Sequence, residues 1–182
     1  MKILEMCVAK DETRRYLEGI YYDPKHEAAV AVDGHKLAVS EDCFYHVFGG
    51  MIIDPYKLEI IDRDFPLWES AFSDHKTKIL GEVLTYKGGF SANKKRGREP
   101  FALVFLKGNE ALEFVPAAEY KESRHELCAY FYQYNLAPMT SGENATWTVE
   151  IPATQEAYMA PYKFSIAGTG FYMVLMPCKF KK

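Results

Sequence analysis

The chain is predicted to be an α+β protein that consists mainly of antiparallel β-sheet, with one or two short helices. Two observations predict this class. Apolar residues recur with a period of two in short segments, and tight-turn residues separate those segments. A third shows that the chain folds around a core: its 182 residues include 13 Tyr, 12 Phe and 2 Trp and carry a net charge of only −3, a composition that disordered chains lack.

The first third of the chain shows three strands joined by tight turns. The strands are expected over 15–23, 27–32 and 36–40. Asp23-Pro24-Lys25 forms the first turn, and Asp33-Gly34 forms the second, where glycine supplies a positive φ. The pattern therefore predicts a three-stranded antiparallel meander.

A short strand and a short helix are expected next. Gly49-Gly50 precedes an apolar strand over 51–54, and Pro55 stands where a helix would begin, behind Asp54 as its N-cap. The helix would include Leu58, Ile60 and Ile61 and end at 62–66. The segment 62–78 is the expected joint between two halves of the chain.

The remaining elements are also read mostly as strands. They are expected over 78–87, 101–107, 111–116, 146–151, 164–167 and 171–177, with a hairpin turn at Gly108-Asn109 and a glycine-rich basic loop over 88–98. The apolar, tyrosine-rich run 126–134 fits either a strand or a buried helix.

Several function classes are disfavoured. No apolar run approaches the roughly 20 residues of a membrane span, and the first residues lack the apolar region of a signal peptide, so we expect a cytoplasmic protein. The four cysteines have no paired spacing, and the five histidines have no metal-ligand spacing. Neither a nucleophile elbow nor a phosphate loop is present. We therefore expect no catalytic residue, no metal and no cofactor.

Three segments resemble one family in the order in which that family carries them. They are RYLEG (15–19) with AVDGHKLA (31–38), DFPLW (64–68) and YMVLMPCKF (172–180). Together they resemble the corresponding segments of the bacterial DNA sliding clamp, the β subunit of DNA polymerase III. The resemblance implies that the chain is a shortened and divergent member of that family. The resemblance implies DNA-clamp-like domains: a unit over 1–62, a connector over 63–78 and a second unit over 79–182.

The resemblance also implies a site. Sliding clamps hold short peptides of polymerase and repair proteins in an apolar cleft, to which all three segments contribute. Carried over position by position, the cleft residues are Leu17, Val32, Gly34, His35, Lys36, Leu37, Pro66, Val174, Met176, Pro177, Cys178, Lys179 and Phe180. The aliphatic side chains would form an apolar wall, and His35 and Lys36 would provide polar contacts at its rim.

The chain also departs from the family. Val32 and Lys36 replace a threonine and an arginine, and the chain is about half as long as a full clamp, without the helix expected before the first matching strand. Association with double-stranded DNA as a homo-oligomer is therefore the less supported part of the implied function. One alternative is a DNA-binding module that uses Lys94, Lys95, Arg96 and Arg98. Others are a clamp-fold scaffold that retains only oligomerisation, and an uncharacterised hydrolase.

Overall fold

The computed structural model describes residues 2–10, 12–71, 77–84, 89–93, 96–106, 112–140, 145–152 and 160–180. The first part of the chain forms α1 (Lys2–Glu5), η1 (Glu12–Leu17), β1 (Ile20–Asp23), β2 (Ala28–Val32), β3 (Lys36–Ser40), η2 (His46–Phe48), β4 (Ile52–Ile53), β5 (Ile60–Ile61) and η3 (Trp68–Ala71). The second part forms β6 (Thr77–Leu84), η4 (Arg96–Arg98), β7 (Pro100–Leu106), β8 (Leu112–Pro116), β9 (His125–Tyr132), α2 (Gln133–Leu136), η5 (Ala137–Thr140), β10 (Trp147–Pro152), β11 (Tyr162–Ile166) and β12 (Phe171–Leu175).

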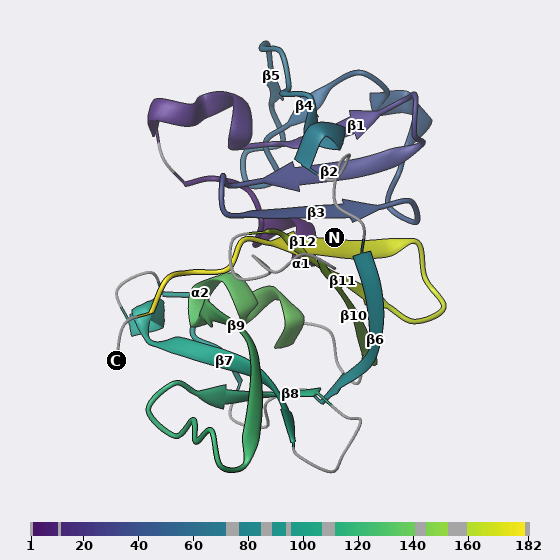
Figure 1. Ribbon diagram of the computed structural model, residues 1–182. Coiled ribbons are helices and arrows are strands. Elements are labelled where there is room, and N and C mark those ends of the chain that lie inside the picture. Colours follow the sequence, from purple (N-terminus) through teal and green to yellow (C-terminus); the bar gives the residue numbers. More distant parts are fainter. Residues whose placement is uncertain are drawn as a thin grey trace.

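Within the described residues the strands join in one sheet, in the order β5-β4-β1-β2-β3-β12-β11-β10-β6-β8-β7-β9. Its pairs are antiparallel except for β6 with β8. Figure 1 shows β1–β5 in one half of the molecule and β6–β9 in the other, with β12 between them. The predicted class, mainly antiparallel β with short helices, is confirmed.

The C-terminal strand joins the two halves of the sheet. β12 pairs with β3 on one side and with β11 on the other. The last described strand therefore lies beside one of the first, and the functional segments predicted at the two ends of the chain become neighbours. The division into units at 1–62, 63–78 and 79–182 stays a prediction.

Two local predictions are wrong. The run that begins at Arg15 starts as the 3-10 helix η1, and its strand begins only at Ile20. The helix expected after Pro55 is instead the turn of the β4–β5 hairpin.

The side chain of Asp54 explains the second error. Its Oδ1 accepts hydrogen bonds from the backbone N–H groups of Tyr56 and Lys57, as a helix N-cap would. Leu58 then adopts a φ of 59°, and the N–H of Asp54 donates to the carbonyl of Glu59. A left-handed residue reverses the chain, so the same cap begins a hairpin.

The other expected strands are present, with ends shifted by a few residues. The ambiguous run 126–134 is resolved as β9 followed by α2. The turn expected at Gly108-Asn109 lies outside the described residues. Within those residues, every helix is too short or too polar to span a bilayer.

The main core lies on one face of the sheet and continues through both halves. In the first half, Ala29 and Ala31 of β2 face Leu4 of α1, and all three are buried. These small side chains allow the helix to approach the sheet closely. In the second half the core is aromatic, and the ring of Phe131 contacts those of Tyr162 and Phe164 edge-on.

Candidate functional site

The opposite face of the β2–β3–β12 region carries a second apolar cluster, which we call the apolar face. Val32 lies opposite Leu37, and Leu37 lies opposite Val174, so these three side chains form one row across the strands. Val30, Val39 and Tyr172 form the adjacent row two residues away. The full cluster contains Tyr21, Ala28, Val30, Val32, Leu37, Val39, Phe65, Trp68, Tyr172 and Val174.

The β2–β3 turn forms one end of this face. Asp33 Oδ1 accepts hydrogen bonds from the N–H groups of His35 and Lys36 at 3.0 and 3.1 Å, and Gly34 has a φ of 91°. This geometry exposes His35 at the tip of the turn. A side chain on Gly34 would be strained at this φ and would also meet the guanidinium of Arg14.

The segment after β12 runs from this turn toward β9. The N–H of Met176 donates to the carbonyl of His35, and the N–H of Cys178 donates to the carbonyl of Tyr130. Phe180 then packs its ring against that of Tyr130, with the centroids 5.1 Å apart. Met176 is 41% exposed and Phe180 is 36% exposed, so Met176 presents apolar surface beside the turn and Phe180 presents it beside β9.

The structure brings most of the predicted cleft residues together. Those within or adjoining the apolar face are Val32, Gly34, His35, Leu37, Pro66, Val174 and Met176. Pro177, Cys178, Lys179 and Phe180 lead away from it toward β9. Leu17 is buried at the end of η1, and the apolar face, as the described residues form it, does not include its side chain.

The rim role predicted for Lys36 is not what the structure shows. Its side chain is only 5% exposed, and its Nζ lies 2.6 Å from Oδ2 of Asp33, which is 3% exposed. The Nζ also lies 5.8 Å from the ring centroid of Tyr134. The turn folds this lysine inward because Asp33, three residues earlier, supplies the countercharge that a buried ammonium needs.

The four thiols are free, as the sequence predicts. Burial raises the pKa of Cys178 to about 11 and that of Cys128 to about 12. Both are therefore protonated at neutral pH and behave as packing residues.

The connector contributes aromatic residues that sequence reasoning missed. Phe65 stacks on Tyr21, with centroids 4.9 Å apart and an interplanar angle of 17°. Trp68 is buried in the apolar face, and its indole N–H donates to Asp23 Oδ2 at 2.9 Å. The DFPLW segment contained this signal, because a phenylalanine and a tryptophan three residues apart in a polar connector require an apolar surface to cover them.

A cluster of charged side chains surrounds the end of that indole. His26 lies between two carboxylates, with Nδ1 2.8 Å from Asp23 Oδ2 and Nε2 3.3 Å from Glu69 Oε1. Lys25 Nζ lies 2.8 Å from the same Glu69 oxygen. The ligand atoms of Asp23, His26 and Glu69 all lie within 4.8 Å of one another. The ammonium of Lys25 on Glu69 opposes a cation there, so the cluster is best explained as a polar anchor of the connector.

Asp23 titrates below its ordinary range. Burial acts to raise its pKa, but hydrogen bonds from the His26 ring, the Trp68 indole and the Lys25 backbone outweigh burial and hold the pKa below 3.8. The ionised carboxylate therefore stabilises the folded state. This contribution is complete above about pH 4 and is lost as the pH falls through the lowered folded-state pKa.

We expect Asp23→Asn to lower the free energy of unfolding by about 1.5–3 kcal/mol at pH 7, the usual contribution of hydrogen bonds to a charged group. The deficit should shrink as the pH falls below about 4, since the wild type then loses the same charge. Urea titrations at pH 7, 5 and 3.5 measure this. A deficit that stays constant over that range contradicts the assigned role of the charge.

The basic loop is described only in part. Lys94 and Lys95 lie outside the described residues, and the side chain of Arg96 is not described. Arg98 is exposed in η4. Gly97 packs tightly beside Tyr134 at the start of α2: a Cβ on Gly97 would lie 3.0 Å from that tyrosine's Cβ and backbone nitrogen.

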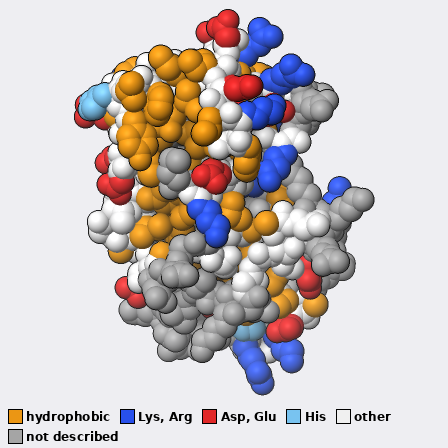
Figure 2. All heavy atoms as spheres, turned by 180° about the vertical axis from the view of Figure 1, so that it is seen from behind, with side chains coloured by type: hydrophobic (Ala, Val, Ile, Leu, Met, Phe, Trp, Pro, Cys, Tyr) orange, Lys and Arg blue, Asp and Glu red, His pale blue; other side chains and the backbone are white. Residues whose placement is uncertain are grey.

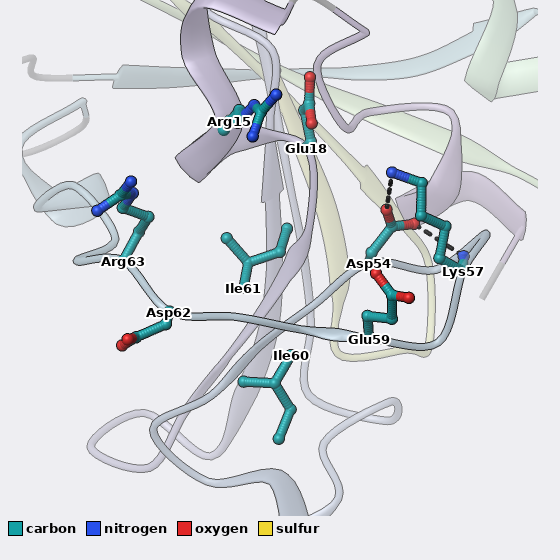
Figure 3. A pocket seen from close by; sticks show the side chains of 9 residues that line it. All are labelled: Arg15, Glu18, Asp54, Lys57, Glu59, Ile60, Ile61, Asp62 and Arg63. Atoms are coloured by element: carbon teal, nitrogen blue, oxygen red, sulfur yellow. Dashed lines mark hydrogen bonds and ion pairs between the residues drawn. The ribbon is translucent and has the colours of Figure 1, made fainter.

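Two other surface features were not predicted. A pocket of about 560 Å³ lies between η1 and the β4–β5 hairpin (Figure 3) and is lined by Arg15, Glu18, Asp54, Lys57, Glu59, Ile60, Ile61, Asp62 and Arg63. Because most of its lining is charged, it does not suit apolar anchors. Hydrophobic side chains also gather behind the half that contains β1–β5 (Figure 2). The exposed ones in this half include Tyr45, Val47 and Met51.

Comparison with known proteins places the fold. No family model matches the sequence, and no curated protein matches it. Solved structures do match, and those reported are DNA sliding clamps of bacteria. More specifically, the chain has the fold of the bacterial DNA sliding clamp, the β subunit of DNA polymerase III. The resemblance predicted from three short segments is thus confirmed as a likeness of fold.

Three sliding clamps illustrate the extent of this likeness. The clamp of Bartonella birtlesii, bound to griselimycin, superposes with a TM-score of 0.60 at 16% identity, over 98% of this chain and 64% of that chain. The clamp of Bacillus subtilis superposes with a TM-score of 0.61 at 13% identity, over 99% of this chain and 62% of that chain. The Helicobacter pylori clamp, bound to a DNA ligase peptide, superposes with a TM-score of 0.55 at 10% identity, over 98% of this chain and 62% of that chain. The chain thus matches under two thirds of the length of these clamps.

Proposed function

We propose that this chain is a non-catalytic, sliding-clamp-like protein of DNA replication or repair in the cytoplasm, and that it binds client peptides on the apolar face. One observation carries the proposal. Val32, Leu37 and Val174, which lie far apart in sequence, form a single apolar row. Exposed His35 and Met176 border that row. The Helicobacter pylori clamp, which shares the fold, binds a DNA ligase peptide.

The chemistry of this surface suits a short peptide with two or three hydrophobic side chains. Burying one Leu or Phe side chain contributes about 1.5–3 kcal/mol. Association entropy opposes binding, so a few such anchors give a dissociation constant of about micromolar order. The ring nitrogens of His35 can form hydrogen bonds with the peptide backbone at the margin.

Fluorescence polarisation with a labelled clamp-binding peptide of the Q-L-x-L-F type tests the proposal. We expect saturable binding with a dissociation constant of roughly 1–100 µM. A peptide with both leucines and the phenylalanine replaced by serine is the control and should not bind. Equal binding of the two peptides, or no binding at several hundred micromolar protein, would remove the basis of the proposal.

DNA association through the basic loop is a second proposal, which the exposed side chain of Arg98 favours. We expect that replacing Lys94, Lys95, Arg96 and Arg98 with serine weakens binding to duplex DNA. We also expect a shallower dependence of log affinity on log salt, by about 0.9 for each phosphate that the variant no longer neutralises. Titrations of labelled DNA between about 50 and 200 mM salt measure this. An unchanged slope contradicts a role of the loop.

Assembly into an oligomer or a ring belongs to the same set of proposals. Light scattering of the purified chain, alone and with duplex DNA, gives the number of copies. A defined oligomer that binds neither peptide nor DNA would favour the scaffold alternative over both binding functions.

A further inference from the structure

We propose that residues 65–69 of the connector form a strap that is latched across the apolar face in the unliganded chain and must be released before a client peptide can bind there. The inference rests on the proposed peptide-binding function and adds a mechanism that regulates it.

The strap already occupies apolar surface that a peptide would need. Phe65 stacks on Tyr21, and Trp68 is buried in the same cluster as Val30 and Val39. These side chains cover the row next to the one that contains Leu37. Leu37 and Val174 are each only 4% exposed. The apolar face therefore offers a ligand little free surface while the strap lies on it.

The strap is held by a small latch at the turn between β1 and β2. The Trp68 indole donates to Asp23, and Glu69 contacts both Lys25 and His26. Between these points and Phe65, Leu67 is 80% exposed. Figure 1 shows η3, where the strap ends, in front of β1 and β2. Trp68 and Glu69 fasten the strap to side chains at the β1–β2 turn, so its release need not break the hydrogen bonds between the strands of the sheet.

The charges of the latch are arranged to hold the connector against the sheet. Lys25 and His26 come from the turn, whereas Glu69 comes from η3. The hydrogen bond to Glu69, together with its charge, raises the pKa of Lys25 above its ordinary value, and His26 links Glu69 to the buried Asp23. Removing Glu69 takes away both ion pairs of the strap with the turn but leaves the core of the sheet intact.

The latch lowers the apparent affinity for a peptide, because only the open fraction of the protein can bind it. A ligand that binds only the open form has an apparent dissociation constant equal to its intrinsic value divided by the open fraction. A variant with a weakened latch raises this fraction and should bind the peptide more tightly, although it has fewer favourable interactions in the closed form. If these residues instead contacted the bound peptide, their removal would weaken binding. Tighter binding in the variant therefore indicates a strap that blocks the site.

Glu69→Ala tests the strap with two independent readouts. Acrylamide quenching reports the strap itself, because Trp68 lies on it and the other tryptophan, Trp147, is fully buried. Peptide affinity reports the cleft. We expect increased quenching and about three- to tenfold tighter binding of the Q-L-x-L-F peptide. Trp68→Phe, which removes the indole N–H but keeps an aromatic ring, should also tighten binding. Glu59→Ala, the same substitution on the β4–β5 hairpin, should change neither readout.

The outcomes separate this inference from the function on which it rests. Unchanged quenching in Glu69→Ala, or peptide affinity that stays equal or becomes weaker in both latch variants, overturns the strap and leaves the peptide-binding function intact. Absence of binding in the wild type and in every variant overturns both, since no site remains to be gated.

Discussion

Lys36→Met is expected to lower the free energy of unfolding by about 3–5 kcal/mol, because it leaves the buried carboxylate of Asp33 without its countercharge. The two side chains are 5% and 3% exposed and lie 2.6 Å apart, so water does not replace the missing partner. Methionine keeps the apolar stem of lysine and is shorter by one atom, which largely separates loss of the charge from loss of packing. Urea unfolding at pH 7 gives the value.

A double substitution isolates the ion pair. Asp33→Asn with Lys36→Met removes both charges but keeps an oxygen that can accept the turn hydrogen bonds from the N–H groups of His35 and Lys36. We expect the double variant to be more stable than Lys36→Met alone and to approach the wild type, since replacing a buried pair by neutral groups is often nearly neutral. If the stability lost in the double variant equals the sum of the losses in Asp33→Asn and Lys36→Met, the two charges are not coupled.

Met176→Asp is expected to weaken peptide binding by about tenfold or more, equivalent to the loss of one apolar anchor of about 1.5–3 kcal/mol. Met176 is an exposed apolar residue at the margin of the apolar face, and its N–H donates to the His35 carbonyl. At 41% exposure the substitution should change the free energy of unfolding little. Leu37→Asp would be a poorer test, because Leu37 is buried and the charge would destabilise the sheet.

Met51→Asp provides the matched control. Met51 is 36% exposed, carries the same side chain and precedes β4 outside the apolar face. It should leave peptide affinity unchanged. If Met51→Asp weakens binding and Met176→Asp does not, the client site lies on the surface around Met51, and the apolar face is not the cleft.

The sequence predicted the strands well where the pattern of side chains is local. Alternation and turn residues placed β2 and β3 and the left-handed glycine between them. The same signals predicted a helix after Pro55 where the chain forms a hairpin turn. An aspartate such as Asp54 can begin either structure, and the left-handed conformation of Leu58 decides for the hairpin. The pairing of β3 with β12 is long-range, and only the resemblance to a family could indicate it.

The candidate site was predicted in part for the same reason. The apolar row followed from matched motifs, but burial depends on neighbours that a pattern does not reveal. A lysine three residues after an aspartate can point to solvent or fold back, and Lys36 folds back. The contact of Trp68 with Asp23 joins residues 45 positions apart. The continuous apolar run of β2 is explained only once α1 covers one face and the strap covers the other.

NMR mapping of the Q-L-x-L-F peptide on isotopically labelled protein tests the central claim most directly, because it locates the site as well as detecting binding. The largest backbone amide shifts are predicted for His35, Leu37, Val174 and Met176, with further shifts in Trp68 and Glu69 as the strap is released. Shifts concentrated instead on residues 43–51 or in the pocket beside the β4–β5 hairpin would contradict the claim that the apolar face is the client site.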